Sequence, residues 1–150
     1  MHALHSIGIS ADRFESPDGT RDFALLDPLE FERFITGLLH QMGFEAQTTK
    51  ASDDGLIDIE AVLERPMVGG RYLFQCKRFG ADNPVGSAAV REFYGALIAD
   101  RKAAKGVFIT TSTFTPQARE FAEGLAIELI DGDQLRTLLN EHNKPPSGPD

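Results

Sequence analysis

Hydrophobic positions along the chain predict helices and strands in alternation. The first clear helix begins at Asp27-Pro28-Leu29-Glu30, where Asp27 caps free backbone N–H groups and Glu30 completes a capping box. The apolar side chains that follow recur every three or four residues and form one helical stripe: Phe31, Phe34, Ile35, Leu38, Leu39 and Met42. Gly43 is expected to end this helix.

The rest of the pattern predicts a mixed sheet. Strands are expected over 44–49, 56–63, 71–78, 106–111 and 126–130, and further helices over 90–104, 115–124 and 133–140. The resulting order is α-β-β-β-α-β-α-β-α, an antiparallel meander that leads into a βαβ crossover. This order predicts an α/β sandwich built around a mixed five-stranded sheet flanked by helices.

The two ends of the chain differ from this pattern. Residues 1–26 have weak periodicity and form a lead-in, in which residues 4–9 are a candidate edge strand. Residues 141–150, EHNKPPSGPD, are polar and Pro-rich, which is typical of a linker or a disordered tail. We therefore expect one folded domain over 27–140.

Composition fits an ordinary globular domain. The 150 residues are 41% hydrophobic and 25% charged, which excludes a disordered chain, a collagen-like repeat and a disulfide scaffold. No apolar run approaches the roughly 20 residues of a membrane span, and the first residues lack the pattern of a signal peptide. The single cysteine, Cys76, cannot form an internal disulfide. These features predict a cytoplasmic protein.

Charge is distributed unevenly along the chain. The net charge of −8 argues against a nucleic-acid partner, because polyanions repel acidic proteins. Residues 65–119, however, carry nine basic and only three acidic side chains. This basic middle third fits a surface for a polyanion and solvated helix faces equally well.

Polar residues occupy the strands expected over 56–63 and 71–78, where the centre of a sheet should be apolar. Alternation places four of them on one face: Asp58, Glu60, Gln75 and Lys77. The other face of the first strand is expected to carry Ile57 and Ile59. Buried charges persist only when they are paired, bound to metal or at an open edge, and surface ion pairs are the plain alternative. A carboxylate beside a lysine also suits phosphodiester hydrolysis with a divalent cation.

Five segments between Leu26 and Leu139 carry a family resemblance: LDPLEFERFITGLLHQMGFEAQTT, SDDGLIDIEAV, YLFQCKRF, GVFITTSTFTPQAREFA and IELIDGDQLRTLL. Their most specific part is Asp-x-Gly-x-x-Asp followed by a Gln-x-Lys strand, together with FITTS-x-F and LIDGDQL. This combination resembles the Mrr-like restriction endonuclease domain, a branch of the PD-(D/E)xK nuclease superfamily. The resemblance implies a nuclease domain over 27–140 with a restriction-endonuclease-like fold.

The resemblance also implies a catalytic site. Asp58 matches the metal-binding aspartate, and the turn Asp54-Gly55 matches the one that presents it. Gln75 and Lys77 match the Gln-x-Lys form of the (D/E)xK element, and Glu32 matches an acidic position often placed beside the metal. Asp58, Gln75 and Glu32 would hold Mg²⁺, which Mn²⁺ should replace, while Lys77 orients the attacking water.

Neutral Gln75 brings no charge, so the site should bind Mg²⁺ more weakly than a site with two carboxylates on the strands. An additional carboxylate would help, and Glu32 and Glu60 are the two candidates for that role. Three cations are candidate DNA contacts, with solvated surface charge as an equal alternative: Arg78, Arg91 and Lys102. Turn capping is the favoured interpretation of a hydroxyl-rich segment: Thr110, Thr111 and Ser112.

The function implied by the resemblance is a Mg²⁺-dependent endodeoxyribonuclease in restriction or antiphage defence. A non-catalytic nucleic-acid-binding or oligomerising domain that kept the nuclease fold is one alternative, supported by Gln75 and the net charge of −8. A branched-DNA resolvase with the same metal chemistry is another. The sequence has no helix-turn-helix or zinc-finger pattern, so we expect weak DNA binding by this chain alone. Targeting would then depend on another domain, a sensor, a partner or a homo-oligomer, and no membrane is involved.

Overall fold

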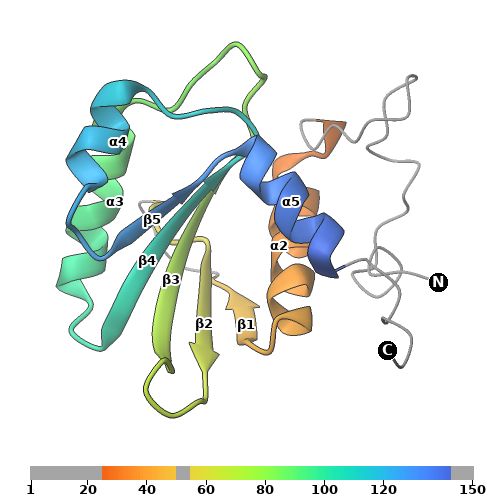
Figure 1. The fold of residues 1–150 in the computed structure, drawn as a ribbon, viewed down its shortest axis with the longest axis vertical. Coiled ribbons are helices and arrows are strands. Elements are labelled where there is room, and N and C mark those ends of the chain that lie inside the picture. Colours follow the sequence, from red (N-terminus) through yellow and green to blue (C-terminus); the bar gives the residue numbers. More distant parts are fainter. Residues whose placement is uncertain (1–24, 50–54, 143–150) are drawn as a thin grey trace, which may run out of the picture.

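A mixed five-stranded sheet with helices on both faces forms the centre of the molecule (Figure 1). The computed structural model describes residues 25–49 and 55–142. Its elements are α2 (Pro28–Gln41), β1 (Glu45–Thr48), β2 (Ile59–Leu63), β3 (Gly70–Lys77), α3 (Ser87–Ala99), β4 (Ala103–Thr110), α4 (Pro116–Ala122), β5 (Ile127–Ile130) and α5 (Gly132–His142). This order is the predicted one, and the predicted α/β fold class is confirmed. The candidate edge strand over 4–9 lies outside the described residues.

The strands lie in the order β1-β2-β3-β4-β5. β1, β2 and β3 are antiparallel neighbours, whereas β3, β4 and β5 run parallel. As a result, β2 begins at the edge of the sheet where β3 and β4 end. This edge lies at the top of Figure 1, and we call it the carboxyl edge.

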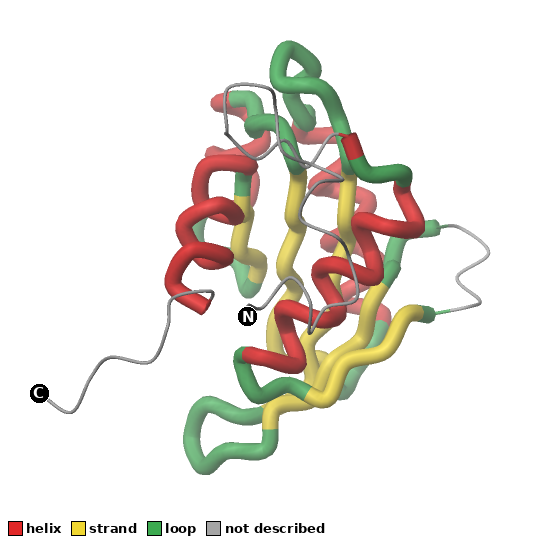
Figure 2. The backbone as a smooth tube through the Cα atoms, turned by 90° about the vertical axis from the view of Figure 1, so that its right-hand side faces the viewer, coloured by secondary structure: helices red, strands yellow, loops and turns green. Residues whose placement is uncertain are grey.

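Two apolar clusters pack on opposite faces of the sheet. α2 and α5 cover one face, where Phe31, Phe34 and Phe74 are almost fully buried. α3 and α4 cover the other face, where Phe93 and Phe108 stack edge to face with ring centroids 5.6 Å apart. Figure 2 views the molecule from the side of α2 and α5, with the sheet behind them. Both faces of β3 and β4 are therefore covered, as parallel strands require.

Several element boundaries differ from the sequence prediction. The helix expected over 90–104 ends at Ala99, because Asp100 accepts a hydrogen bond from the backbone N–H of Lys102 and turns the chain into β4. The strand expected over 56–63 begins only at Ile59. α5 continues to His142, two residues into the expected tail, and residues 143–150 lie outside the described part. None of the described helices has the length and apolar character that a membrane crossing requires.

Candidate active site

Three of the four predicted catalytic residues meet at the carboxyl edge of the sheet. Gln75 and Lys77 lie among the last three residues of β3, and Asp58 immediately precedes β2. Because β2 runs antiparallel to β3 and Ile59 pairs with Phe74, the start of β2 lies beside the end of β3. Sheet topology therefore brings together residues that are 17 positions apart in the sequence.

The carboxylate of Asp58 is held by donors from β3. Its Oδ2 accepts a hydrogen bond of 2.8 Å from the backbone N–H of Cys76 and lies 3.4 Å from Nε2 of Gln75. Burial raises the pKa of Asp58, while the bond from Cys76 and the charge of Lys77 act in the opposite direction. Because burial has the largest effect, the surrounding donors and the lysine only partly offset the cost of this negative charge.

Gln75 is nearly inaccessible to solvent, with 3% of its surface exposed. Its Nε2 also donates to the carbonyl oxygen of Gly55, at 3.2 Å, which ties the strand to the turn before Asp58. A half turn of the amide would present Oε1 in place of Nε2. An amide oxygen in that position is a ligand that hard cations accept.

Glu32 approaches Asp58 from α2, on the face of the sheet that Phe74 and Cys76 line, whereas alternation along β3 turns Gln75 and Lys77 to the other face. It lies in the second turn of α2, which starts at the predicted capping box between Asp27 and Glu30. Burial raises the pKa of the half-buried Glu32, and the negative charge of Asp58 raises it further. The two carboxylates thus repel each other in a partly desolvated space. We call Glu32, Asp58, Gln75 and Lys77 the Asp58 cluster.

Cys76 lies within reach of both carboxylates but points into the core. Its pKa is raised mainly by burial and further by the charges of Asp58 and Glu32. The thiol packs at the edge of the apolar cluster under α2. Cys76 is therefore a small core residue, and its backbone N–H, rather than its sulfur, contacts Asp58.

The chemistry of this donor set fits a hard divalent cation. Asp58 and Glu32 supply carboxylate oxygens and Gln75 supplies an amide oxygen, the ligand types that Mg²⁺ and Mn²⁺ prefer. Within residues 25–49 and 55–142, no three His, Cys, Asp or Glu side chains gather as a metal-ligand group. A cation here would therefore need Gln75, with water or phosphate oxygens to complete its shell.

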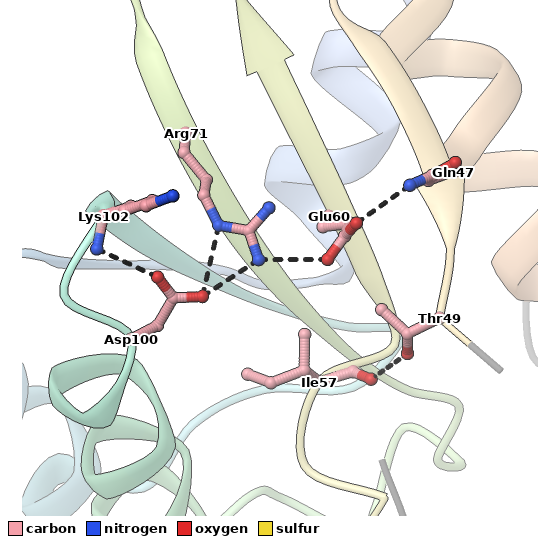
Figure 3. A network of polar contacts seen from close by, with 7 residues as sticks. All are labelled: Gln47, Thr49, Ile57, Glu60, Arg71, Asp100 and Lys102. Carbon is pink, nitrogen blue, oxygen red and sulfur yellow. Dashed lines mark hydrogen bonds and ion pairs between the residues drawn. The ribbon is translucent and has the colours of Figure 1, made fainter. Parts of the chain in front are cut away.

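Glu60 does not join the Asp58 cluster. Its Oε1 accepts from Gln47 at 2.8 Å and its Oε2 pairs with Arg71 at 3.0 Å, and Arg71 also pairs with Asp100 at 2.9 Å (Figure 3). These contacts lower the pKa of Glu60, with the bond from Gln47 as the largest cause. We call Gln47, Glu60, Arg71 and Asp100 the Glu60 network. Glu32, not Glu60, is the second carboxylate beside Asp58.

The prediction of a regular strand through Asp58 is wrong. Ile57 packs under α3 and α4, whereas Ile59 packs under α2, so the two side chains do not share a face. The cause is local: β2 starts at Ile59, and Asp58 uses its side chain to accept the bond from Cys76 at the strand end. Strict alternation holds only inside a paired ladder.

The three candidate DNA contacts lie in different places. Arg78 directly follows β3 and is half-buried beside the cluster. Arg91 lies on the outer surface of α3, with its guanidinium 4.8 Å from the ring centre of Phe121. Lys102 precedes β4 at the opposite edge of the sheet, eight residues or about 26 Å along the chain from Thr110, the strand partner of Lys77. Of the three, Arg78 is the one placed next to the site.

The hydroxyl-rich segment after β4 faces backbone rather than solvent. Thr110 and Thr111 hydrogen-bond to the chain just beyond β3, and Ser112 bonds to the carbonyl of Asn83. The hydroxyls thus bond to backbone, but the partners lie 29 to 33 residues away, between Lys77 and Asn83, rather than in a turn of their own. A local bond runs from the N–H of Ser112 to Oγ1 of Thr110. The Asp54 side of the turn before Asp58 lies outside the described residues, whereas Gly55 contributes its carbonyl to Gln75.

Comparison with known proteins finds restriction endonucleases in sequence and in structure. A family model described as a restriction endonuclease, of Mrr type, matches residues 23–139. The type IV methyl-directed restriction enzyme EcoKMrr of Escherichia coli strain K12 is 38% identical over 123 residues, a match that covers 78% of this chain and 39% of that protein. The chain therefore spans about two fifths of this curated relative.

Two solved structures share the fold. The DNA modification-dependent restriction endonuclease AspBHI aligns with a TM-score of 0.64 and 22% identity, over 77% of this chain and 31% of its own. The MspJI restriction endonuclease, solved in complex with a 27-mer oligonucleotide, aligns with a TM-score of 0.59 and 18% identity, over 86% of this chain and 33% of its own. At these identities the likeness establishes the architecture.

Proposed function

This chain belongs to the Mrr-type restriction endonuclease family, and on that premise we propose that it hydrolyses DNA phosphodiester bonds as a Mg²⁺-dependent endonuclease in restriction of foreign DNA. The observation that carries the proposal is the Asp58 cluster. Two partly desolvated carboxylates, from α2 and the start of β2, act on each other through their charges, and Asp58 also contacts the buried amide of Gln75 and interacts with the charge of Lys77. Perturbed carboxylates that converge in this way are typical of catalytic sites.

Asp58, Gln75 and Glu32 are the residues that would hold Mg²⁺ or Mn²⁺. A bound divalent ion supplies Lewis-acid polarisation of the phosphate and lowers the pKa of a bound water. The backbone N–H of Cys76 fixes the Asp58 carboxylate, so this ligand does not have to be ordered when the ion binds.

Lys77 has a separate role in this proposal. The charge of Lys77 acts to lower the pKa of Asp58, which supports a position near the carboxylate that would hold the ion. From there the ammonium orients the attacking water and offsets negative charge that develops on the phosphate. Arg78, one residue further, is the cation best placed to contact the DNA backbone.

DNA recognition by this chain alone should be weak. The net charge of −8 opposes binding to a polyanion, and such binding would fall steeply with salt. The chain spans 39% of its curated relative, which is named as methyl-directed. We propose that targeting depends on a further domain, a partner or a second copy of this chain.

The test is nicking of supercoiled plasmid with Mg²⁺, with Mn²⁺ and with a chelator. Wild type should nick only when metal is present, and Asp58→Ala and Lys77→Ala should both lose this activity. Arg101→Ala is the control, because it removes an exposed cation from the turn before β4, at the opposite edge of the sheet. Nicking by Asp58→Ala at the wild-type rate would show that the site is assigned wrongly.

The same assay separates the alternatives. No cleavage and no metal-induced rise in melting temperature would favour a non-catalytic domain that kept the fold. A metal-induced rise that Asp58→Ala abolishes, without cleavage, would indicate a competent site that needs another domain. Faster cleavage of a four-way junction than of plasmid DNA would favour a resolvase.

A further inference from the structure

The chain that leaves β3 is fastened by three side-chain hydroxyls from the end of β4. Lys77 and Thr110 are the last paired residues of the two strands. The hydroxyl of Thr110 donates to the carbonyl oxygen of Lys77 at 2.9 Å. The backbone N–H of Thr111 donates to the same oxygen at 3.1 Å. We call Thr110, Thr111 and Ser112 the hydroxyl clasp.

In the clasp, the hydroxyl of Thr111 both accepts a hydrogen bond from the backbone and donates one to it. Its Oγ1 accepts from the backbone N–H of Phe79 at 2.7 Å and donates to the carbonyl of the same residue at 2.6 Å. One hydroxyl thus satisfies both polar backbone groups two residues after Lys77. Ser112 extends the clasp, because its hydroxyl donates to the carbonyl of Asn83 in the following loop at 2.9 Å.

These hydroxyls are withdrawn from solvent. The exposed fractions are 0% for Thr110, 7% for Thr111 and 3% for Ser112. Each hydroxyl is already bonded to backbone, so binding a phosphate would require breaking internal bonds. The clasp is therefore built to hold the chain after β3 rather than to contact DNA.

The clasp itself is fixed from the opposite side by α5. The backbone N–H of Gly132 donates to the carbonyl of Ser112 at 2.9 Å. A Cβ at Gly132 would lie 2.4 Å from the carbonyl oxygen of Thr111, so this close approach requires glycine. The first residue of α5 therefore packs tightly against the backbone of Thr111 and Ser112, which restricts the movement of the residues that carry the hydroxyls.

We propose that the hydroxyl clasp positions Lys77 for catalysis, with Thr111 as its main positioning residue. The inference rests on the proposed nuclease function. The clasp fixes the backbone at Lys77 and at Phe79, so the direction in which the lysine side chain leaves the sheet is set before DNA arrives. Displacement of a catalytic group by about 1 Å costs on the order of 100-fold in rate.

The experiment measures kcat and KM for Mg²⁺-dependent plasmid nicking in the full chain, well below the melting temperature of each variant. Thr111→Val removes the hydroxyl and keeps the shape, and it should lower kcat about 10–100-fold with KM for DNA unchanged. Thr111→Ser keeps the hydroxyl and should restore kcat to within about threefold of wild type. Thr110→Val, which leaves the Thr111 bonds to Phe79 in place, should lower kcat about three- to tenfold.

Leu97→Ala is the control for lost stability. Leu97 is 5% exposed and packs near the last turn of α3, away from the carboxyl edge. It should lower the melting temperature without lowering kcat. If Thr111→Val does not fold, the kcat of Thr110→Val is used as the test. An unchanged kcat in Thr110→Val would then overturn the inference.

The outcomes separate the inference from the function on which it rests. A wild-type chain that never nicks DNA overturns the proposed function and the inference with it. Nicking by wild type together with an unchanged kcat in Thr111→Val overturns the inference alone. Equal loss of kcat in Thr111→Val and Thr111→Ser, or in Leu97→Ala, also overturns it, because the role would then be structural.

Discussion

The Asp58 cluster and the Glu60 network lie at opposite ends of β2 and β3, and the shifts of their carboxyl pKa values are opposite. In the Glu60 network one guanidinium, Arg71, pairs with two carboxylates, and the pKa values of Glu60 and Asp100 are both lowered. In the Asp58 cluster two carboxylates share a partly buried space, and the pKa values of Asp58 and Glu32 are both raised. The first group of charges is compensated within the protein, and the second is compensated only in part.

This difference supports our proposal that the Asp58 cluster is catalytic, whereas the Glu60 network is structural. The Glu60 network joins β2 and β3 to the turn before β4, and its contacts satisfy its charges (Figure 3). The Asp58 cluster keeps negative charge where burial makes it costly. A protein retains such a cost where the charge has another partner, and a divalent cation is the partner that carboxylate and amide oxygens suit.

The largest effect on activity outside the metal ligands is expected at Lys77. Lys77→Ala removes the ammonium that orients water and offsets charge, and groups of this kind contribute about 10²–10⁴-fold to rate. The kcat of plasmid nicking should fall within that range, and the melting temperature should change little. Arg71→Met, which removes the cation of the Glu60 network, should leave the kcat of plasmid nicking near the wild-type value. Equal losses in the two variants would remove the distinction between the groups.

Glu32→Gln should weaken the metal site without abolishing it. Loss of the second carboxylate is expected to raise the Mg²⁺ concentration needed for half-maximal nicking by about 10–100-fold, the effect of removing a supporting group at a metal site. Saturating Mg²⁺ should restore most of the rate. Glu45→Gln, an exposed carboxylate on β1, is the matched control. A Mg²⁺ requirement that stays the same in Glu32→Gln would place this residue outside the site.

Two changes of carboxylate to amide should shift stability in opposite directions. In metal-free buffer at pH 7, Asp58→Asn removes a desolvated charge yet keeps an acceptor for Cys76, so it should stabilise the fold by about 1 kcal/mol. Glu60→Gln breaks the pair with Arg71 and should destabilise the fold by about 1 kcal/mol. Urea denaturation of wild type and both variants measures the change in the free energy of unfolding, which should be an increase for Asp58→Asn and a decrease for Glu60→Gln. Destabilisation by Asp58→Asn would mean that its charge is compensated in the folded protein.

The smallest expected effect is the pH dependence of those two differences. The pKa of Glu60 is lowered from 4.5, so its ion pair stabilises the fold above that pH and is lost as the pH falls through the lowered value. The pKa of Asp58 is raised from 3.8, so its charge destabilises the fold above the raised value, and this penalty disappears as the pH falls to 3.8. On acid titration, the advantage of Asp58→Asn should therefore disappear by about pH 3.8, and the deficit of Glu60→Gln should begin to shrink below about pH 4.5. An advantage of Asp58→Asn or a deficit of Glu60→Gln that grows on acid titration, measured by urea denaturation, would contradict the assigned shifts.

Local signals in the sequence predicted most of the fold. The capping box at Asp27 and Glu30 and the apolar stripe behind it define α2 as the structure has it. The order of elements followed from periodicity alone. The end of α3 was predicted too late, because the bond from Lys102 to Asp100 is a contact between side chain and backbone that leaves no trace in hydrophobic pattern.

The site was predictable in its residue types but not in its geometry. The Gln-x-Lys strand and Asp58 do meet, as the resemblance implies. Alternation wrongly grouped Glu60 with Asp58. The two-residue repeat of side-chain direction holds only within a regular strand, and β2 begins only after Asp58. The bond from the N–H of Cys76 was not predictable, because every residue except proline offers that donor.

The central claim is that Asp58 serves catalysis and Glu60 serves the fold, and one assay tests it directly. Initial rates of Mg²⁺-dependent plasmid nicking are measured for wild type, Asp58→Asn and Glu60→Gln under identical conditions. We predict a rate for Asp58→Asn at least about 10³-fold below wild type, as expected when a metal ligand is lost, and a rate for Glu60→Gln within about threefold of wild type. Nicking by Asp58→Asn at the wild-type rate, or equal losses in both variants, would contradict the account.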